Sequence, residues 1–110
     1  MCPLVLTLDY PKTISWKAGE TSPEVPINIH VTNRLTGKDS FVDFDFEVNS
    51  FEFGSKFLYK GQFKVSVRNL HPGLSHVIKL MAVFLKPGIF NLNRFNFKVD
   101  MPQGRITYVF

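Results

Sequence analysis

The stretch Val42–Val48, with the sequence VDFDFEV, decides the fold of this chain. Apolar residues occupy every second position, and the positions between them carry two aspartates and a glutamate. Because successive side chains of a β-strand point to opposite faces, this alternation buries one face in a core and leaves the other in water. The stretch therefore predicts a half-buried β-strand and not a helix.

The same alternation recurs along the chain on both sides of this stretch. It is found over Leu4–Tyr10, Val25–Val31 and Phe57–Val67. Val77–Leu85 is apolar on both faces apart from Lys79, as expected for a central strand, and two further strands are expected over Ile89–Val99, which is rich in Phe and Asn, and Arg105–Phe110. Turn sequences rich in Pro and Gly separate these segments, and no helical periodicity competes with them. We expect an all-β fold, an antiparallel β-sandwich of about seven strands, immunoglobulin-like or fibronectin-III-like and without a disulfide.

Composition limits the class of protein. The chain has 110 residues, of which 45% are hydrophobic and 12 are Phe, so it has the size and content of one sandwich domain over 1–110 and is not disordered. We expect this domain to be cut from a longer chain, since it begins and ends on strand-like sequence. No run is long enough to span a membrane as a helix, and the single cysteine favours a reducing, cytoplasmic setting. The net charge of +4 is too dilute for a nucleic-acid binder.

No motif of catalysis stands out. The three histidines, His30, His71 and His76, lie on different segments without the three or four donors that zinc needs. The acidic positions of the opening stretch are spread along one strand, whereas a calcium site gathers its ligands around one point. We expect a protein with no catalytic residue, no metal and no cofactor.

Two groups of residues are candidates for binding. The first is a basic strip of residues four apart on one face of the expected strand Phe57–Val67, formed by Lys56, Lys60, Lys64 and Arg68. It would suit phospholipid headgroups, nucleic acid or an acidic partner. The alternative interpretation is an ordinary solvated face whose cations pair across strands with the acidic residues of Val42–Val48 or protect an edge.

The second candidate is an apolar interaction face formed by Phe90, Leu92 and Phe110. In a regular strand, Phe90 and Leu92 would point away from Phe95 and Phe97, and both faces cannot pack into one core. Either a bulge near Asn91–Asn93 changes the phase of the strand, or one face is left for another domain or subunit.

The segment from Phe57 to Phe97 resembles the carboxy-terminal β-sandwich of large subunits of the transport protein particle (TRAPP) tethering complex. The resemblance lies in the spacing of Phe57, Tyr59 and Gly61, in the Leu70-x-Pro72-Gly73 turn, and in the closing run Pro87–Phe95. It covers about 40 residues. The residues carried over from it are expected to determine the fold, not to form a site: Tyr59, Gly61, Pro72, Gly73, Pro87 and Gly88.

This resemblance implies a non-catalytic protein–protein interaction module of a vesicle-tethering complex in endoplasmic-reticulum-to-Golgi transport and autophagy. The implied partners are other subunits of the complex and, indirectly, a Rab-type GTPase; the implied location is cytoplasmic and Golgi-associated. Weak contact with anionic membranes is compatible with it, and nucleic acid is not an expected partner. Two alternatives remain open: a cytoskeletal or ciliary immunoglobulin-like domain of the sperm-protein type, and a peripheral lipid-binding sandwich that uses the basic strip.

Overall fold

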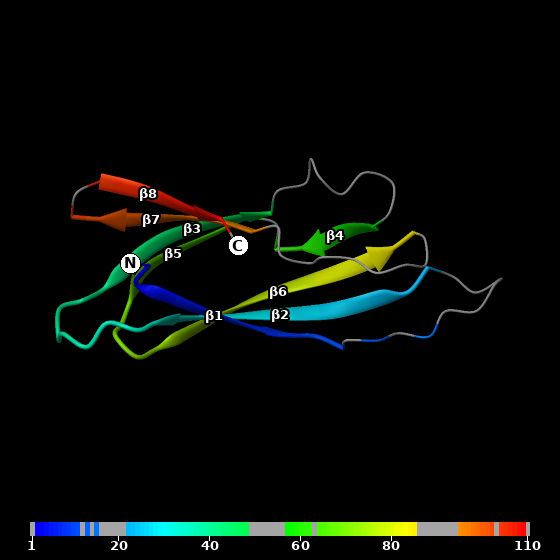
Figure 1. Ribbon diagram of the computed structural model, residues 1–110, viewed down its shortest axis with the longest axis horizontal. Helices are drawn as coiled ribbons and strands as arrows, with labels where there is room; N and C mark the ends of the chain where they lie inside the picture. Colours follow the sequence, from blue (N-terminus) through cyan, green and yellow to red (C-terminus); the bar gives the residue numbers. More distant parts are fainter. Residues whose placement is uncertain are drawn as a thin grey trace.

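The computed structural model describes residues 2–11, 13, 15, 22–48, 57–62, 64–85, 95–102 and 104–109, and it is built from two antiparallel four-stranded sheets. The first sheet has the order β1 (Leu4–Asp9), β2 (Glu24–Asn33), β6 (Ser75–Phe84), β4 (Phe57–Gly61). The second has the order β5 (Lys64–Leu70), β3 (Val42–Val48), β7 (Phe95–Met101), β8 (Gly104–Val109). Figure 1 shows the two sheets as separate layers, which confirms the predicted antiparallel β-sandwich.

The core lies between the layers, and its centre is aromatic. Phe44 and Phe46 of β3 and Phe95 and Phe97 of β7 are fully buried, with ring centroids of neighbouring pairs 5.1–5.8 Å apart. The first sheet covers them with buried aliphatic side chains, chiefly Ile27, Ile29, Val31, Ile78 and Leu80. The alternation in Val42–Val48 is thus realised as predicted, since its apolar residues are buried and its acidic residues face outward.

The segment expected to be one strand over Phe57–Val67 is two strands in different sheets. Its first part, β4, pairs with β6, and its second part, β5, pairs with β3. Because β6 and β3 belong to opposite layers, the chain must cross from one layer to the other between Gly61 and Lys64. This crossing explains why the described residues form eight strands and not seven.

Gly61 permits the crossing, and Gln62 completes it. The φ angle of Gly61 is 102°, and a Cβ at this position would lie 3.0 Å from the carbonyl oxygen of Lys79 on β6. Only glycine adopts that angle readily and allows so close an approach. Beyond it, the Gln62 backbone N–H donates to the Lys79 carbonyl at 3.2 Å, and the Lys79 N–H donates to Gln62 Oε1 at 2.7 Å. Gly61 therefore lies where the backbones of β4 and β6 approach closely.

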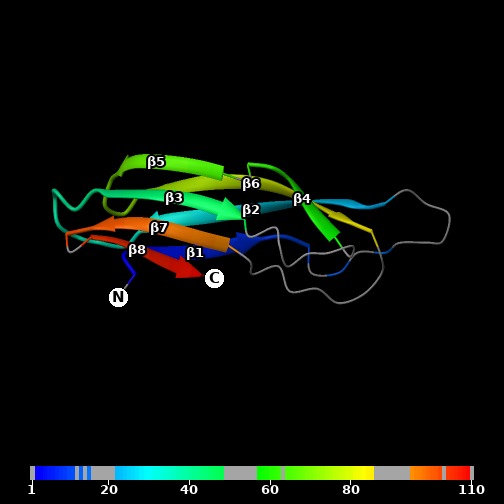
Figure 2. The same cartoon turned by 90° about the horizontal axis from the view of Figure 1, so that it is seen from above.

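The two sides of the sandwich differ as a result. On one side, β4 and β5 are consecutive in the chain and link the layers. On the other side, β8 ends the second sheet and β1 ends the first, and both strands lie along the same margin in the view from above (Figure 2). No helix that is long and apolar enough to cross a bilayer is present in the part of the chain described above.

Candidate functional site

Part of the sequence-predicted site falls outside the described residues. This applies to the whole apolar interaction face (Phe90, Leu92 and Phe110), to Lys56 of the basic strip and to the turn residues Pro87 and Gly88. For these residues the sequence predictions stay predictions.

The described members of the basic strip are divided between two strands of different sheets. Lys60 lies on β4 in the first sheet, where its Nζ is 2.6 Å from Oε1 of Glu24. Lys64 and Arg68 lie on β5 in the second sheet, and Arg68 Nη2 is 3.1 Å from Oδ1 of Asp45 on β3. Pairing of the strip with the acidic face is thus confirmed for Arg68. Among the described members, Lys64 alone has no ion pair with a described residue, which weakens the case for a lipid-binding strip.

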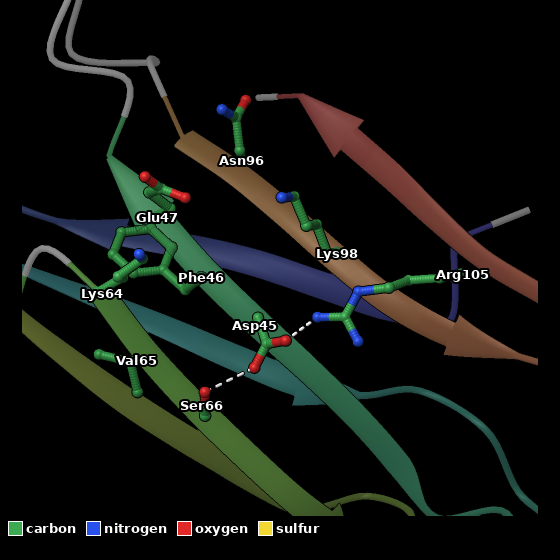
Figure 3. Close-up of a pocket in the computed structure, with 9 residues that line it drawn as sticks. All are labelled: Asp45, Phe46, Glu47, Lys64, Val65, Ser66, Asn96, Lys98 and Arg105. Carbon is green, nitrogen blue, oxygen red and sulfur yellow. Dashed lines mark hydrogen bonds and ion pairs between the residues drawn. The ribbon is translucent and has the colours of Figure 1, made fainter.

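Asp45 ties together the outer face of the second sheet. Its Oδ1 accepts hydrogen bonds from Ser66 Oγ at 2.6 Å and from Arg68 Nη2 at 3.1 Å, both on β5. Its Oδ2 forms an ion pair with Arg105, which reaches from β8 across β7 and also contacts Asp100 at 2.8 Å. Figure 3 shows Asp45 between Ser66 and Arg105. With both oxygens engaged, Asp45 links three strands, β3, β5 and β8.

An open hollow of about 410 Å³ surrounds this network. Its rim includes Glu47, Lys64, Asn96 and Lys98, whose polar ends face solvent (Figure 3). No group of three or more metal-ligating side chains occurs in the described ranges. The hollow is therefore a part of the sheet face that is lined by side chains of both charges.

A different kind of surface is held in place by Asn33, the last residue of β2. Asn33 is fully buried, and its side-chain Nδ2 donates to the carbonyls of Ser40 at 2.7 Å and Leu70 at 2.9 Å. Its Oδ1 accepts from the Leu35 N–H at 3.0 Å, and its backbone N–H donates to the Leu74 carbonyl at 3.0 Å. The Asn33 side chain thus links the β2–β3 loop to the end of β5 by hydrogen bonds. The Asn33 backbone is hydrogen-bonded to the β5–β6 turn.

The two connections fastened by Asn33 carry exposed apolar side chains at one end of the sandwich (left in Figure 1). We call Leu35, Phe41 and Leu74 the apolar tip; they are 38%, 44% and 56% exposed. The Phe41 ring packs edge-on against the His71 ring, with centroids 4.7 Å apart. Backbone groups of Leu35 and Leu74 are hydrogen-bonded to Asn33, and Phe41 follows Ser40, whose carbonyl accepts from the Asn33 side chain.

Gly73, a turn residue carried over from the resemblance, has a structural role at this end. Gly73 has a φ angle of 78°, and its N–H donates to the Asn33 carbonyl at 2.8 Å. Pro72 precedes it in the turn between β5 and β6.

Tyr59, also carried over from the resemblance, is buried on β4, and its ring centroid lies 6.0 Å from that of Phe95. Burial, with a smaller contribution from Tyr10, raises the pKa of the Tyr59 phenol above its usual range.

The sequence analysis did not identify the apolar tip. Its signal is present in the sequence, since Leu35 lies within a stretch of turn residues and Leu74 directly follows the Pro72-Gly73 turn. Neither position belongs to an alternating strand pattern, so neither leucine is required by the core. Comparison with known proteins adds no identity: no family model matches the chain, and no curated protein matches it significantly.

Proposed function

We propose that this chain is a non-catalytic protein–protein interaction module of a multisubunit, TRAPP-like vesicle-tethering complex, with a cytoplasmic and Golgi-associated location. The apolar tip is the observation that carries the interaction role. The resemblance of Phe57–Phe97 to the sandwich of large TRAPP subunits supports the choice of assembly. Other subunits of the complex would be the direct partners, and a Rab-type GTPase an indirect one.

The shape of the tip supports a protein as the partner. It projects from two connections whose backbones are bound to a buried residue, so little order has to be gained on binding. Charged residues flank it in the β2–β3 loop, where Arg34, Lys38 and Asp39 are exposed. An apolar centre with a polar rim is the usual arrangement of a protein interface.

The test is recovery of partner subunits from cytosol by the immobilised chain, with the bound proteins identified by mass spectrometry. We expect other tether subunits to be recovered by the wild-type chain. Leu74→Asp should reduce this recovery by about tenfold or more, because truncating or charging an interface anchor typically has an effect of this size. The matched control is Leu85→Asp, since Leu85 is 41% exposed and follows β6 at the opposite end of the sandwich.

The outcomes separate the alternatives. Recovery of tubulin or axonemal proteins in place of tether subunits would support the sperm-protein type of domain and overturn the tethering assignment. Equal loss with Leu74→Asp and Leu85→Asp would overturn the tip as the binding surface. Binding to anionic liposomes that is lost in Lys60→Glu and Lys64→Glu would support the lipid-binding alternative.

A further inference from the structure

The free edge of β8 differs from the other three edges of the sandwich. An edge strand exposes unpaired backbone N–H and C=O groups, and proteins usually protect such edges with lysine, proline, charge or a bulge. β4 carries exposed Lys60, and β5 carries Lys64 and Arg68 and has a register irregularity opposite Val42 to Phe44. β1 ends at Asp9 and lies between Pro3 and Pro11.

β8 contains no lysine and no proline, and its register with β7 is regular. Its sequence, GRITYV, contains one charged residue, Arg105, whose guanidinium is turned back over the sheet to Asp45 and Asp100. Val109 is 71% exposed, the largest exposure of any bulky apolar residue in the described ranges. No described strand pairs with its outer edge. This edge is therefore ready to accept another strand.

The side chains of β8 show which strand fits. In an antiparallel pair of two β8 strands centred on Thr107, Thr107 faces Thr107 of the second copy, and Ile106 faces Tyr108 of the second copy. Pairs of threonines, and of aromatic with β-branched residues, are among the favourable cross-strand pairs. Val109 faces Arg105 of the second copy, whose charge is already neutralised within its own sheet. No like charges meet in this register.

The same register satisfies the backbone. Alternate residues of an edge strand direct their N–H and C=O groups outward. In the register centred on Thr107, residue 105 of one copy lies opposite residue 109 of the other, 106 lies opposite 108, and the two copies of 107 lie opposite each other. The residue numbers in each pair differ by an even number. Each outward-directed residue of one copy therefore meets an outward-directed residue of the other. The arrangement has two-fold symmetry and closes on itself, as in most homodimers.

The inner side of this pair is also apolar. Ile106 and Tyr108 are half-buried at the margin of the second sheet, and Leu6 and Leu8 of β1 are half-buried at the margin of the first. Figure 2 shows β8 and β1 along the same margin of the sandwich. A second copy added at β8 would place its own Ile106 and Tyr108 next to this margin and remove part of it from water.

We propose that two copies of this chain associate through antiparallel pairing of their β8 strands about Thr107, which joins the two second sheets into one eight-stranded sheet, four strands from each copy. The contact involves the 6 residues of β8, compared with about 20–30 residues per side in a standard interface, so the dimer is weak. The association uses a surface other than the apolar tip and does not depend on the proposed function.

The test is disulfide trapping of single-cysteine variants in a Cys2→Ser background. Thr107→Cys brings two cysteines opposite each other, with Cα atoms about 4.5–5.5 Å apart, which a disulfide can span. Val109→Cys is the matched control on the same strand. In this register the two copies of residue 109 are offset by four positions, or about 13 Å, which a disulfide cannot span. Under a mild oxidant we expect Thr107→Cys to form dimers at least about tenfold faster than Val109→Cys, although Val109 is the more exposed position.

Sedimentation of the Cys2→Ser chain, diluted from about 1 mM, provides the second measurement. We expect concentration-dependent dimerisation that persists in Thr107→Val and is lost in Thr107→Lys, which sets two ammonium groups against each other. Thr7→Lys on β1 controls for the added charge and should still dimerise, and circular dichroism verifies that each variant is folded. The proposal is overturned by monomers at every concentration, or by trapping of Val109→Cys as fast as Thr107→Cys.

Discussion

Substituting Asn33 by alanine should be among the most damaging single changes in the described part of this chain. Asn33 is the only buried polar residue among the described positions, and its side chain makes hydrogen bonds to Ser40, Leu70 and Leu35. Asn33→Ala removes all three bonds and leaves two carbonyl groups and one N–H group without that partner. Around the Leu70 carbonyl the site is fully buried, so water cannot replace the amide there without rearrangement.

The cost follows from the burial of each bond. A buried backbone group left without a partner costs about 1–3 kcal/mol, and each of the two part-buried bonds contributes about 0.5–1.5 kcal/mol. We therefore expect Asn33→Ala to lower the free energy of unfolding by about 3 kcal/mol. In a domain of this size the corresponding decrease in Tm is about 12–20 °C. Urea unfolding followed by circular dichroism should show a lower midpoint with an unchanged m-value.

Asn28→Ala is the matched control, because Asn28 lies on the same strand and its side chain makes no hydrogen bond to a described residue. It should change stability by less than about 0.5 kcal/mol. Asn33→Asp is a second diagnostic: it replaces the donating amide with a carboxylate that faces two carbonyl oxygens, so its stability should improve as the pH falls and the carboxyl is protonated. A loss below about 1 kcal/mol in Asn33→Ala would refute the role of Asn33 as the anchor of the tip.

Three further changes test other parts of the structure. Gly61→Ala should lower the free energy of unfolding, measured by urea titration, by about 2–3 kcal/mol. The φ angle of 102° at Gly61 disfavours any residue with a Cβ, and that Cβ would lie 3.0 Å from the Lys79 carbonyl oxygen. An unchanged stability would contradict the close approach at the sheet crossing. Burial raises the pKa of Tyr59 from 10.0, so the phenol keeps its proton in the folded state, and the free energy of unfolding should decrease as the pH rises above about 10. Tyr59→Phe should make this decrease with pH shallower in thermal melts at alkaline pH. An unchanged slope would contradict the burial of the Tyr59 phenol. Asp45→Ala should cost only about 1 kcal/mol, and less in high salt, because its ion pairs are solvent-exposed; a large, salt-independent loss in thermal melts would contradict this.

Most strands could be predicted from the sequence because each has a local signal. Alternation of apolar and polar residues in Val42–Val48 specifies which side chains are buried, whatever strand lies beside them. The apolar composition of the segment near Val77 likewise indicated a central strand, and β6 does lie between β2 and β4. What each strand pairs with has no such local signal, so the division at Gly61 into two strands of different sheets was not anticipated.

The candidate site was harder to predict for the same reason. Leu35 and Leu74 are 39 positions apart in the sequence, and the structure shows that backbone groups of both are hydrogen-bonded to Asn33. Lys60 and Lys64 are close in sequence and appeared to belong to one strip, yet the crossing places them on opposite sheets. Proximity in sequence was therefore a poor guide to proximity on the surface.

The period-two pattern and the phenylalanine content determine by themselves that this chain forms two facing layers, because each strand must bury one apolar face and a second sheet is the simplest way to cover it. The pairing of the strands depends on long-range contacts, and only the tertiary structure shows it. That pairing leaves Leu74 and its neighbours exposed at one end and the edge of β8 open at one side. Both proposed surfaces are thus made of residues that the core does not use, and only the pairing of the strands shows where on the molecule they lie.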